Sequence, residues 1–298
     1  MTARKVHLSA AAIFVVLVGL TFPSAVARAL TFRLTWDPSI VRPGAVVPMI
    51  VKSPVPLTRV EAVVSGERFP LIRTSTGNYV ALVGIDLGMD APVNRVEFFL
   101  YMKGRAAPYR MVGDLKVQSR KFGSQSLSLP AGMVDLAGNT LERVRKDSGR
   151  LRSVLAERVE KRYWEKPFVL PVSGRISTRF GTRRILNGKP RSPHSGIDIA
   201  APRGTPIAAA NRGEVILAAD LFLSGNTVVI DHGWGLLTIY AHMDSISVRE
   251  HRLVDRGDIL GRVGSSGRAT GPHLHFGVFI RGAKVDPEQL LDLTFPLL

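Results

Sequence analysis

The chain has 298 residues, no Cys, and 40 Lys and Arg against 24 Asp and Glu, which leaves a formal net charge of +16. Without Cys it can form no disulfide, no thiol nucleophile, no iron–sulfur cluster and no structural zinc site of the usual Cys-rich kind. The basic balance favours polyanionic partners, but no nucleic-acid recognition motif and no basic stretch interleaved with aromatic residues occurs, so we expect no nucleic-acid partner.

Residues 1–29 have the pattern of a secretory signal peptide. Arg4 and Lys5 precede an apolar run over residues 8–20, and small residues follow at 25–29, which predicts cleavage after Ala27 or Ala29. The run is shorter than the ~18–20 residues that span a bilayer, so a retained anchor is the lesser alternative. We therefore expect export to the periplasm or cell envelope and no stable membrane span after cleavage.

The 269 residues after the signal peptide suggest two domains. The first, over residues 30–122, begins with strict alternation of apolar and polar residues at 30–36, and further short apolar runs lie between turn signals. About seven strands at these intervals predict an immunoglobulin-like β-sandwich. Pro48 favours an edge position for its strand. The predicted strands cover residues 30–36, 45–51, 60–64, 69–72, 79–85, 96–102 and 109–117.

Residues 123–165 are interpreted as a linker that contains a helix. Apolar side chains recur there at helical spacing from Leu141 to Val159, and Gly149 is a weak point that costs about 1 kcal/mol relative to Ala. The polar face of this helix is rich in Arg and Lys, which most often means only a solvated surface. Such charge would also attract an anionic cell envelope, with a strength that falls as salt increases.

The remaining segment, residues 166–298, carries four metal-competent side chains at even spacings: His194 with Asp198, and His273 with His275. Even spacing places side chains on one face of a β-strand, and the opposite face of residues 273–280 is wholly apolar. Two imidazoles and a carboxylate with one open position are typical of a catalytic zinc site. Spacing alone does not choose between His273 and His275 as a ligand.

A further candidate, His242, ends the second strand of a predicted hairpin over residues 227–242, where it shares a face with Thr238 and Tyr240. The other histidines have no assigned task, because His7 lies in the leader, His232 in a turn and His251 in a polar loop. The helical zinc motif, the serine nucleophile elbow and the phosphate-binding loop are all absent from the sequence.

From about residue 168 to residue 291 the chain resembles the lysostaphin-type, or LytM-like, zinc metallopeptidases. The resemblance rests on the His-x-x-x-Asp and His-x-His spacings and on several further matching segments. It implies a mostly antiparallel β-sheet peptidase domain in which Zn²⁺ is bound by His194, Asp198 and His275, while His242 and His273 are catalytic. The matching segments are residues 180–183, 201–206, 225–228, 231–233, 240–242 and 271–276.

The fold expectation is therefore a mainly β chain: a sandwich domain, a linker helix and a peptidase domain. The resemblance implies a secreted zinc endopeptidase that hydrolyses the peptide cross-links of peptidoglycan, with zinc-bound water as the nucleophile. The alternative is a non-enzymatic or latent wall-binding protein that activates another hydrolase, a role of family members that have lost ligands. Members of the family cut either D-alanine–diaminopimelate cross-links or glycine bridges, and the predicted export signal favours the former.

Overall fold

The computed structural model describes residues 12–18, 30–36, 38–90, 92–157 and 159–293. Contacts within the chain divide it into two units. The first unit comprises Met1–Pro43, Val47–Ser119 and Pro296–Leu298, and the second comprises Gly44–Val46 and Arg120–Phe295. The predicted domain limits at residues 30–122, 123–165 and 166–298 stay predictions, and each unit is described here by itself.

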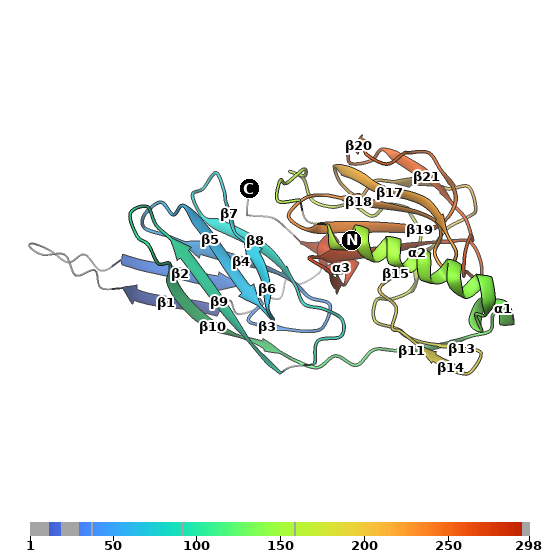
Figure 1. The fold of residues 1–298 in the computed structure, drawn as a ribbon, viewed down its shortest axis with the longest axis horizontal. Helices are drawn as coiled ribbons and strands as arrows, with labels where there is room; N and C mark the ends of the chain where they lie inside the picture. The colour runs from blue at the N-terminus through green and yellow to red at the C-terminus, as the bar shows by residue number, and fades with distance from the viewer. Residues whose placement is uncertain (1–11, 19–29, 37, 91, 158, 294–298) are drawn as a thin grey trace, which may run out of the picture. The chain divides into compact units, whose positions relative to one another are not determined.

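The first unit contains two five-stranded sheets (Figure 1). One sheet has the order β1 (Ala12–Val18), β2 (Leu30–Trp36), β4 (Val46–Lys52), β8 (Tyr79–Gly84), β7 (Ile72–Arg73). The other has the order β3 (Ile40–Val41), β10 (Tyr109–Val117), β9 (Val93–Tyr101), β5 (Arg59–Val64), β6 (Glu67–Pro70). Six of the seven predicted strands of this region are confirmed within a few residues at their ends, whereas the predicted strand over residues 69–72 is wrong, because it is divided between β6 and β7, which belong to different sheets.

Alternating side chains close the space between these two sheets. Phe32, Leu34 and Trp36 of β2 are buried, and buried and exposed residues alternate along the whole of β10. The Trp36 ring stacks on Phe98 of β9, in the other sheet, with centroids 6.2 Å apart. The two sheets therefore share one core, as a β-sandwich does, whereas the immunoglobulin-like classification stays a prediction.

The edge position expected for Pro48 is wrong. Its strand, β4, lies between β2 and β8. Among the described residues, pairing between β2 and β4 runs from Trp36 opposite Met49 to Arg33 opposite Lys52.

Of the predicted signal peptide, only residues 12–18 lie among the described residues, and they form β1. This strand pairs antiparallel with β2, from Ala12 opposite Trp36 to Val18 opposite Leu30. Cleavage at the predicted site would remove β1 and leave β2 as an edge of its sheet. Among the described residues, no helix combines the length and apolarity needed to cross a membrane.

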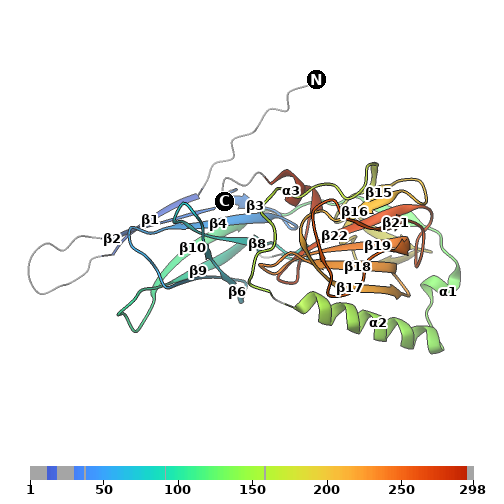
Figure 2. The ribbon, with the colours of Figure 1, turned by 90° about the horizontal axis from the view of Figure 1, so that it is seen from above.

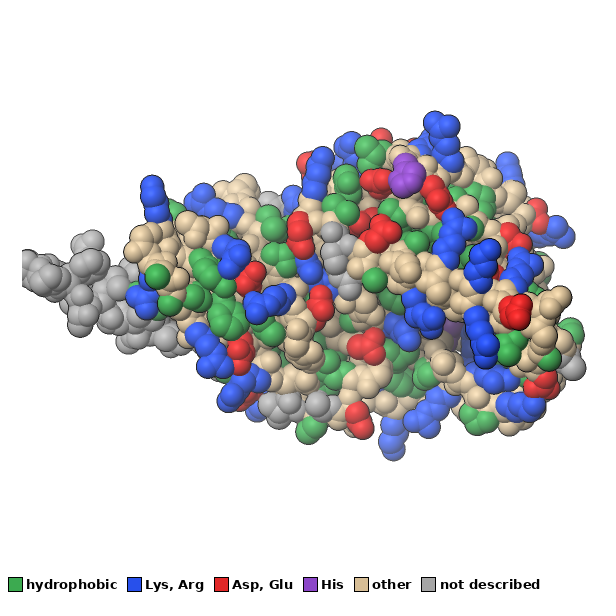
Figure 3. Space-filling model, viewed as in Figure 1, with side chains coloured by type: hydrophobic (Ala, Val, Ile, Leu, Met, Phe, Trp, Pro, Cys, Tyr) green, Lys and Arg blue, Asp and Glu red, His purple; other side chains and the backbone are tan. Residues whose placement is uncertain are grey.

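The second unit begins with the segment expected to be a linker, which packs against the large sheet of this unit. This segment forms β11 (Ser124–Leu127), α1 (Ala131–Val134) and α2 (Gly138–Ala156). Val154 of α2 shares a hydrophobic cluster with Leu217 and Leu237 of the large sheet, and α2 runs along this sheet (Figure 2). The helix ends before Val159, and its exposed face carries Lys and Arg (Figure 3).

The large sheet of the second unit has ten strands, and every neighbouring pair in it is antiparallel, which confirms the predicted β architecture. Its main path is β12 (Arg175–Thr178), β15 (Gly196–Ala200), β22 (His273–Ile280), β19 (Leu236–Ile246), β18 (Gly225–Asp231), β17 (Gly213–Leu221), β20 (Leu253–Val254). Joined to this path are β16 (Pro206–Ala208), β21 (Ile259–Val263) and β23 (Ala283–Val285).

The second unit also contains a separate, three-stranded sheet. It has the order β11, β13 (Arg183–Leu186), β14 (Lys189–Arg191), and β11 pairs parallel with β13. A short helix, α3 (Pro287–Asp292), follows β23. The three-stranded sheet matters for function because β11 and β13 border the polar cleft described below.

Candidate metal centre

Strand pairing brings together the two halves of the predicted metal site, which lie about eighty residues apart in the sequence. Asp198 of β15 is directly opposite His275 of β22, and Ala200 is opposite His273. Directly opposed side chains on one face of an antiparallel pair have Cβ atoms only about 4.5–5.5 Å apart. The pairing register therefore makes Asp198 and His275 contact partners.

His194 lies just before β15 rather than on the predicted strand. Two backbone bonds to the preceding loop hold it: its N–H donates to the Thr182 carbonyl at 2.9 Å, and its own carbonyl accepts from the Gly181 N–H at 2.8 Å. The His194 side chain is buried beside Asp198. The connection between β12 and β13, which contains Gly181 and Thr182, therefore holds the backbone of His194 in place. The sequence-based prediction of a strand at His194 did not include this contact.

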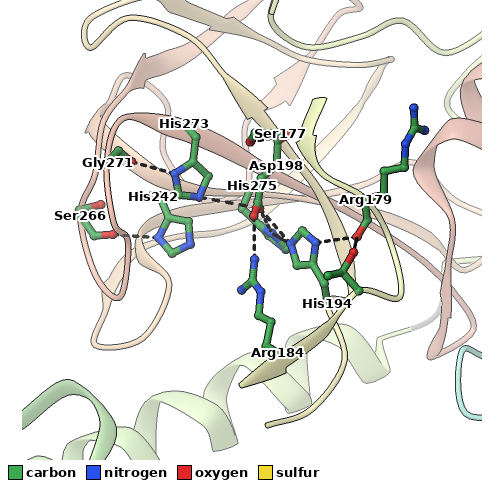
Figure 4. A network of polar contacts seen from close by, with 11 residues as sticks. Ser177, Arg179, Arg184, His194, Asp198, His242, Ser266, Gly271, His273 and His275 are labelled. Atoms are coloured by element: carbon green, nitrogen blue, oxygen red, sulfur yellow. Dashed lines mark hydrogen bonds and ion pairs between the residues drawn. The ribbon is translucent and has the colours of Figure 1, made fainter. Parts of the chain in front are cut away.

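Three potential ligand atoms converge at this point (Figure 4). His194 Nε2 lies 2.8 Å from His275 Nδ1 and 2.9 Å from Asp198 Oδ1, and His275 Nδ1 lies 2.9 Å from the same oxygen. Ligand atoms of a tetrahedral zinc with bonds of about 2.0–2.1 Å stand about 3.3 Å apart. Small movements of these side chains would therefore accommodate a zinc ion.

The protonation states of these groups also fit a bound cation. Burial raises the pKa of the Asp198 carboxyl. Hydrogen bonds with His194 and His275 lower this pKa by more than burial raises it, so the pKa lies well below its usual range. Burial lowers the pKa of His194 to about 4. A carboxylate and a neutral imidazole are the forms that bind metal ions.

Neighbouring groups orient the potential ligands. His194 Nδ1 lies 3.1 Å from the Arg179 carbonyl, a contact in which the ring N–H donates and Nε2 is left for a metal. Arg184 donates from Nη2 to Asp198 Oδ2 at 2.7 Å, which leaves Oδ1 for the site. Such outer contacts set the tautomer and direction of metal ligands. Sequence reasoning missed Arg184, which directly follows the matching segment 180–183.

His242 and His273 lie next to the three converging atoms, and their rings are 4.9 Å apart. His242 Nδ1 lies 2.8 Å from the Ser266 carbonyl, and His273 Nδ1 lies 2.8 Å from the Gly271 carbonyl. Because carbonyls only accept, both rings are held with Nδ1 protonated and Nε2 available. His273 Nε2 is 3.8 Å from Asp198 Oδ1, so His273 lies outside the converging group, which includes His275.

His242 does not end its strand, contrary to the expectation. Strand β19 continues to Ile246, and the pairing register with β18 shifts between Tyr240 and Met243. His242 lies within this bulge with a φ of 61°. Positive φ is costly for a residue other than glycine, and such strain is concentrated at functional sites. The bulge breaks the alternation that would have placed His242 on one face with Thr238 and Tyr240.

His232 lies in the connection between β18 and β19, as expected, and its surroundings show why it has both ring nitrogens engaged. Its side chain is fully buried, with Nδ1 2.8 Å from the Arg212 carbonyl and Nε2 2.8 Å from the Thr238 hydroxyl oxygen. Both nitrogens therefore have a partner in the core. His251 is exposed, with Nδ1 3.3 Å from Glu214 Oε1. His7 lies outside the described residues.

Sequence comparisons identify relatives of this part of the chain. A model described as Peptidase family M23 matches residues 192–287. The peptidoglycan DD-endopeptidase ShyA of Vibrio cholerae is 41% identical over 113 residues, which are 38% of this chain and 26% of that protein. The DD-carboxypeptidase/endopeptidase Mpg of Neisseria meningitidis is 42% identical over 113 residues, with the same coverage. The chain therefore matches about a quarter of the length of these curated relatives.

A structural comparison extends the likeness beyond the metal centre. A crystal structure described as an M23 peptidase of Pseudomonas aeruginosa superposes with a TM-score of 0.64 and 30% sequence identity, covering 84% of this chain and 94% of that one. Similarity of sequence around the converging histidines and similarity of fold over most of the chain lead to one conclusion: this protein belongs to peptidase family M23, a family of metallopeptidases.

Proposed function

We propose that this protein is a zinc-dependent endopeptidase that hydrolyses peptide cross-links of bacterial peptidoglycan. The observation that carries the proposal is the convergence of two imidazole nitrogens and one carboxylate oxygen within 2.9 Å of one another. The names of its relatives support the same activity. A family member that only binds the wall would need no such donor set, so the enzyme is favoured over the non-enzymatic alternative.

In this proposal His194, Asp198 and His275 bind the zinc ion. When bound, zinc supplies a Lewis acid that polarises the scissile carbonyl and lowers the pKa of the attacking water. The ligand atoms in this proposal are the three that converge: His194 Nε2, Asp198 Oδ1 and His275 Nδ1. Arg184 keeps the carboxylate turned toward the site through its bond to Asp198 Oδ2.

His242 and His273 handle protons and developing charge beside the ion. Each has its Nδ1–H committed to a backbone carbonyl, so each directs Nε2 to the reacting groups. One accepts a proton from the attacking water and later delivers a proton to the leaving amine, and the other stabilises the oxyanion. The geometry does not require that either ring bind the metal.

The proposed substrate bond is the cross-link between D-alanine and diaminopimelate. Two relatives that are 41% and 42% identical around the site carry the names DD-endopeptidase and DD-carboxypeptidase/endopeptidase. The sequence-based expectation of export to a periplasm favours the same bond over glycine bridges. Export through the signal peptide at residues 1–29, and attraction of the basic surface to an anionic envelope, are further parts of this proposal.

The test is digestion of defined, purified peptidoglycan by the full chain loaded with zinc, followed by mass spectrometry of the released fragments. We expect cross-linked dimers to become monomers that end in D-alanine. An Asp198→Asn variant serves as the inactive control, because it keeps the size of the side chain and removes its charge. Undiminished hydrolysis by this variant, or no change in cross-linking with the zinc-loaded wild type, would contradict the proposal.

A further inference from the structure

A polar cleft of about 290 Å³ lies beside the metal centre. Asp198, His242 and His273 form part of its lining, and residues 268–272 of the loop between β21 and β22 form another part. The same loop provides the carbonyls of Ser266 and Gly271 that accept from the two histidines. Any group bound by this loop is therefore close to the reacting centre.

The charges around this cleft are unbalanced. Its lining includes two guanidinium groups, Arg184 and Arg268, and one carboxylate, Asp198. Asp198 is already engaged by Arg184 and by the proposed zinc site. The lining thus has an excess of positive charge, to which a bound zinc ion would add.

Arg268 is the cation in this cleft without a partner. Within the described part of the chain, its half-buried guanidinium has no hydrogen bond or ion pair, whereas Arg184 pairs with Asp198 and Arg191 donates to the Val134 carbonyl. Burial lowers the pKa of Arg268, and the charges of Arg184 and Arg191 lower it further. Arginine nevertheless stays protonated in proteins. A half-buried cation that has no partner and is repelled by neighbouring cations costs folding free energy unless an anion binds it.

We propose that Arg268 binds a carboxylate of the substrate peptide and thereby selects cross-links whose leaving residue carries a free carboxylate. This inference rests on the proposed function and extends it to the recognition of the substrate. The planar fork of arginine matches a carboxylate with two parallel hydrogen bonds. A diaminopimelate residue has a carboxylate beside the amine that forms the cross-link, whereas a glycine bridge has no charge there.

The position of Arg268 in the chain explains how recognition would support catalysis. Arg268 lies between Ser266 and Gly271, whose carbonyls hold His242 and His273. A carboxylate bound at Arg268 would place the neighbouring amide next to both rings. Binding energy away from the scissile bond is then used to orient the reacting groups.

The test uses two synthetic cross-linked peptides that differ in one group: the leaving residue carries a free carboxylate in one and a carboxamide in the other. We expect the zinc-loaded full chain to cut the acid with a kcat/KM at least about tenfold higher, the size of one charge-assisted hydrogen bond. The ratio of kcat/KM for the acid to kcat/KM for the carboxamide should fall toward one in Arg268→Gln. In Arg268→Lys, which keeps the charge and loses the planar fork, this ratio should lie between those of the wild type and Arg268→Gln.

Arg249→Gln is the matched control, since it removes the same charge from an exposed residue outside the cleft lining. It should keep the wild-type ratio.

Calorimetric binding of the two amine products gives a second measurement that needs no turnover, and the acid product should bind more tightly to the wild type than to Arg268→Gln. A wild-type ratio near one, or an unchanged ratio in Arg268→Gln, would overturn the inference. If neither peptide is cut while the acid product still binds more tightly, the proposed activity fails and carboxylate recognition stands.

Discussion

The four histidines at the metal centre and His232, all in the second unit, have different surroundings. His194 and His275 direct nitrogen atoms at each other and at Asp198, and His242 and His273 each have one nitrogen left available. His232 is fully buried, and a backbone carbonyl and a threonine hydroxyl engage both of its nitrogens. Burial alone therefore does not identify a functional histidine. A ring nitrogen that lies near the buried Asp198 carboxylate, or is left available beside it, is the distinguishing feature.

The largest effect on zinc content and activity should follow removal of a proposed metal ligand, in contrast to removal of His232. We expect His194→Ala to lose bound zinc and to lower kcat/KM on the order of 10³-fold or more, because both the Lewis acid and the activated water are lost. Elemental analysis of the purified variant measures the metal and fragment release measures the activity. Retention of one zinc per chain would show that His194 is not a ligand.

Removal of a flanking histidine should separate chemistry from metal binding. His242→Ala and His273→Ala should each keep zinc and lower kcat by about 10²–10⁴-fold, the usual contribution of general acid–base catalysis. The measurements are zinc content and kcat on the same preparation of each variant. If either variant loses its zinc in proportion to its activity, that histidine belongs with the ligands instead.

His232 should affect stability in acid rather than activity. Burial lowers the pKa of His232 to about 4, so between pH 6.5 and 4 the unfolded chain binds a proton that the folded chain does not. Stability therefore falls with decreasing pH, by about 3 kcal/mol at most for this group.

The variant His232→Asn tests that expectation. Denaturant unfolding at pH 7 and pH 4 should show a smaller acid loss in the variant than in the wild type, by about 3 kcal/mol. Its zinc content at pH 7 should match that of the wild type. An acid loss of equal size in both proteins would show that other groups cause it.

The smallest effect we expect concerns Arg184, which orients Asp198 without reaching the metal. Arg184→Gln should weaken zinc affinity by about 10–100-fold, as measured by competition with a chelator. Arg183→Gln is the matched control, because Arg183 is adjacent in the sequence and exposed. Equal zinc affinities for the wild type and Arg184→Gln would show that Arg184 does not orient Asp198 for metal binding.

Local patterns were sufficient for much of the fold. The alternation at Phe32, Leu34 and Trp36 and the apolar face of residues 274–280 correctly predicted strands, because burial of one face imposes a period of two. The helix was predicted from its apolar spacing, although it ends at Ala156 rather than near Val159. That the helical segment packs on the large sheet depends on contacts with distant residues such as Leu217, which no local pattern reports.

At the site, the residue types and their spacings in the sequence by itself determined which side chains were candidates, and resemblance to known peptidases supplied their roles. The spacing left open whether His273 or His275 joins His194 and Asp198, and in the tertiary structure it is His275. Only the tertiary structure decided that His242 occupies a bulge and that Arg184 and Arg268 border the same cleft. The physical reason is that these relations depend on strand register and loop direction. Both are set by packing between segments far apart in the chain.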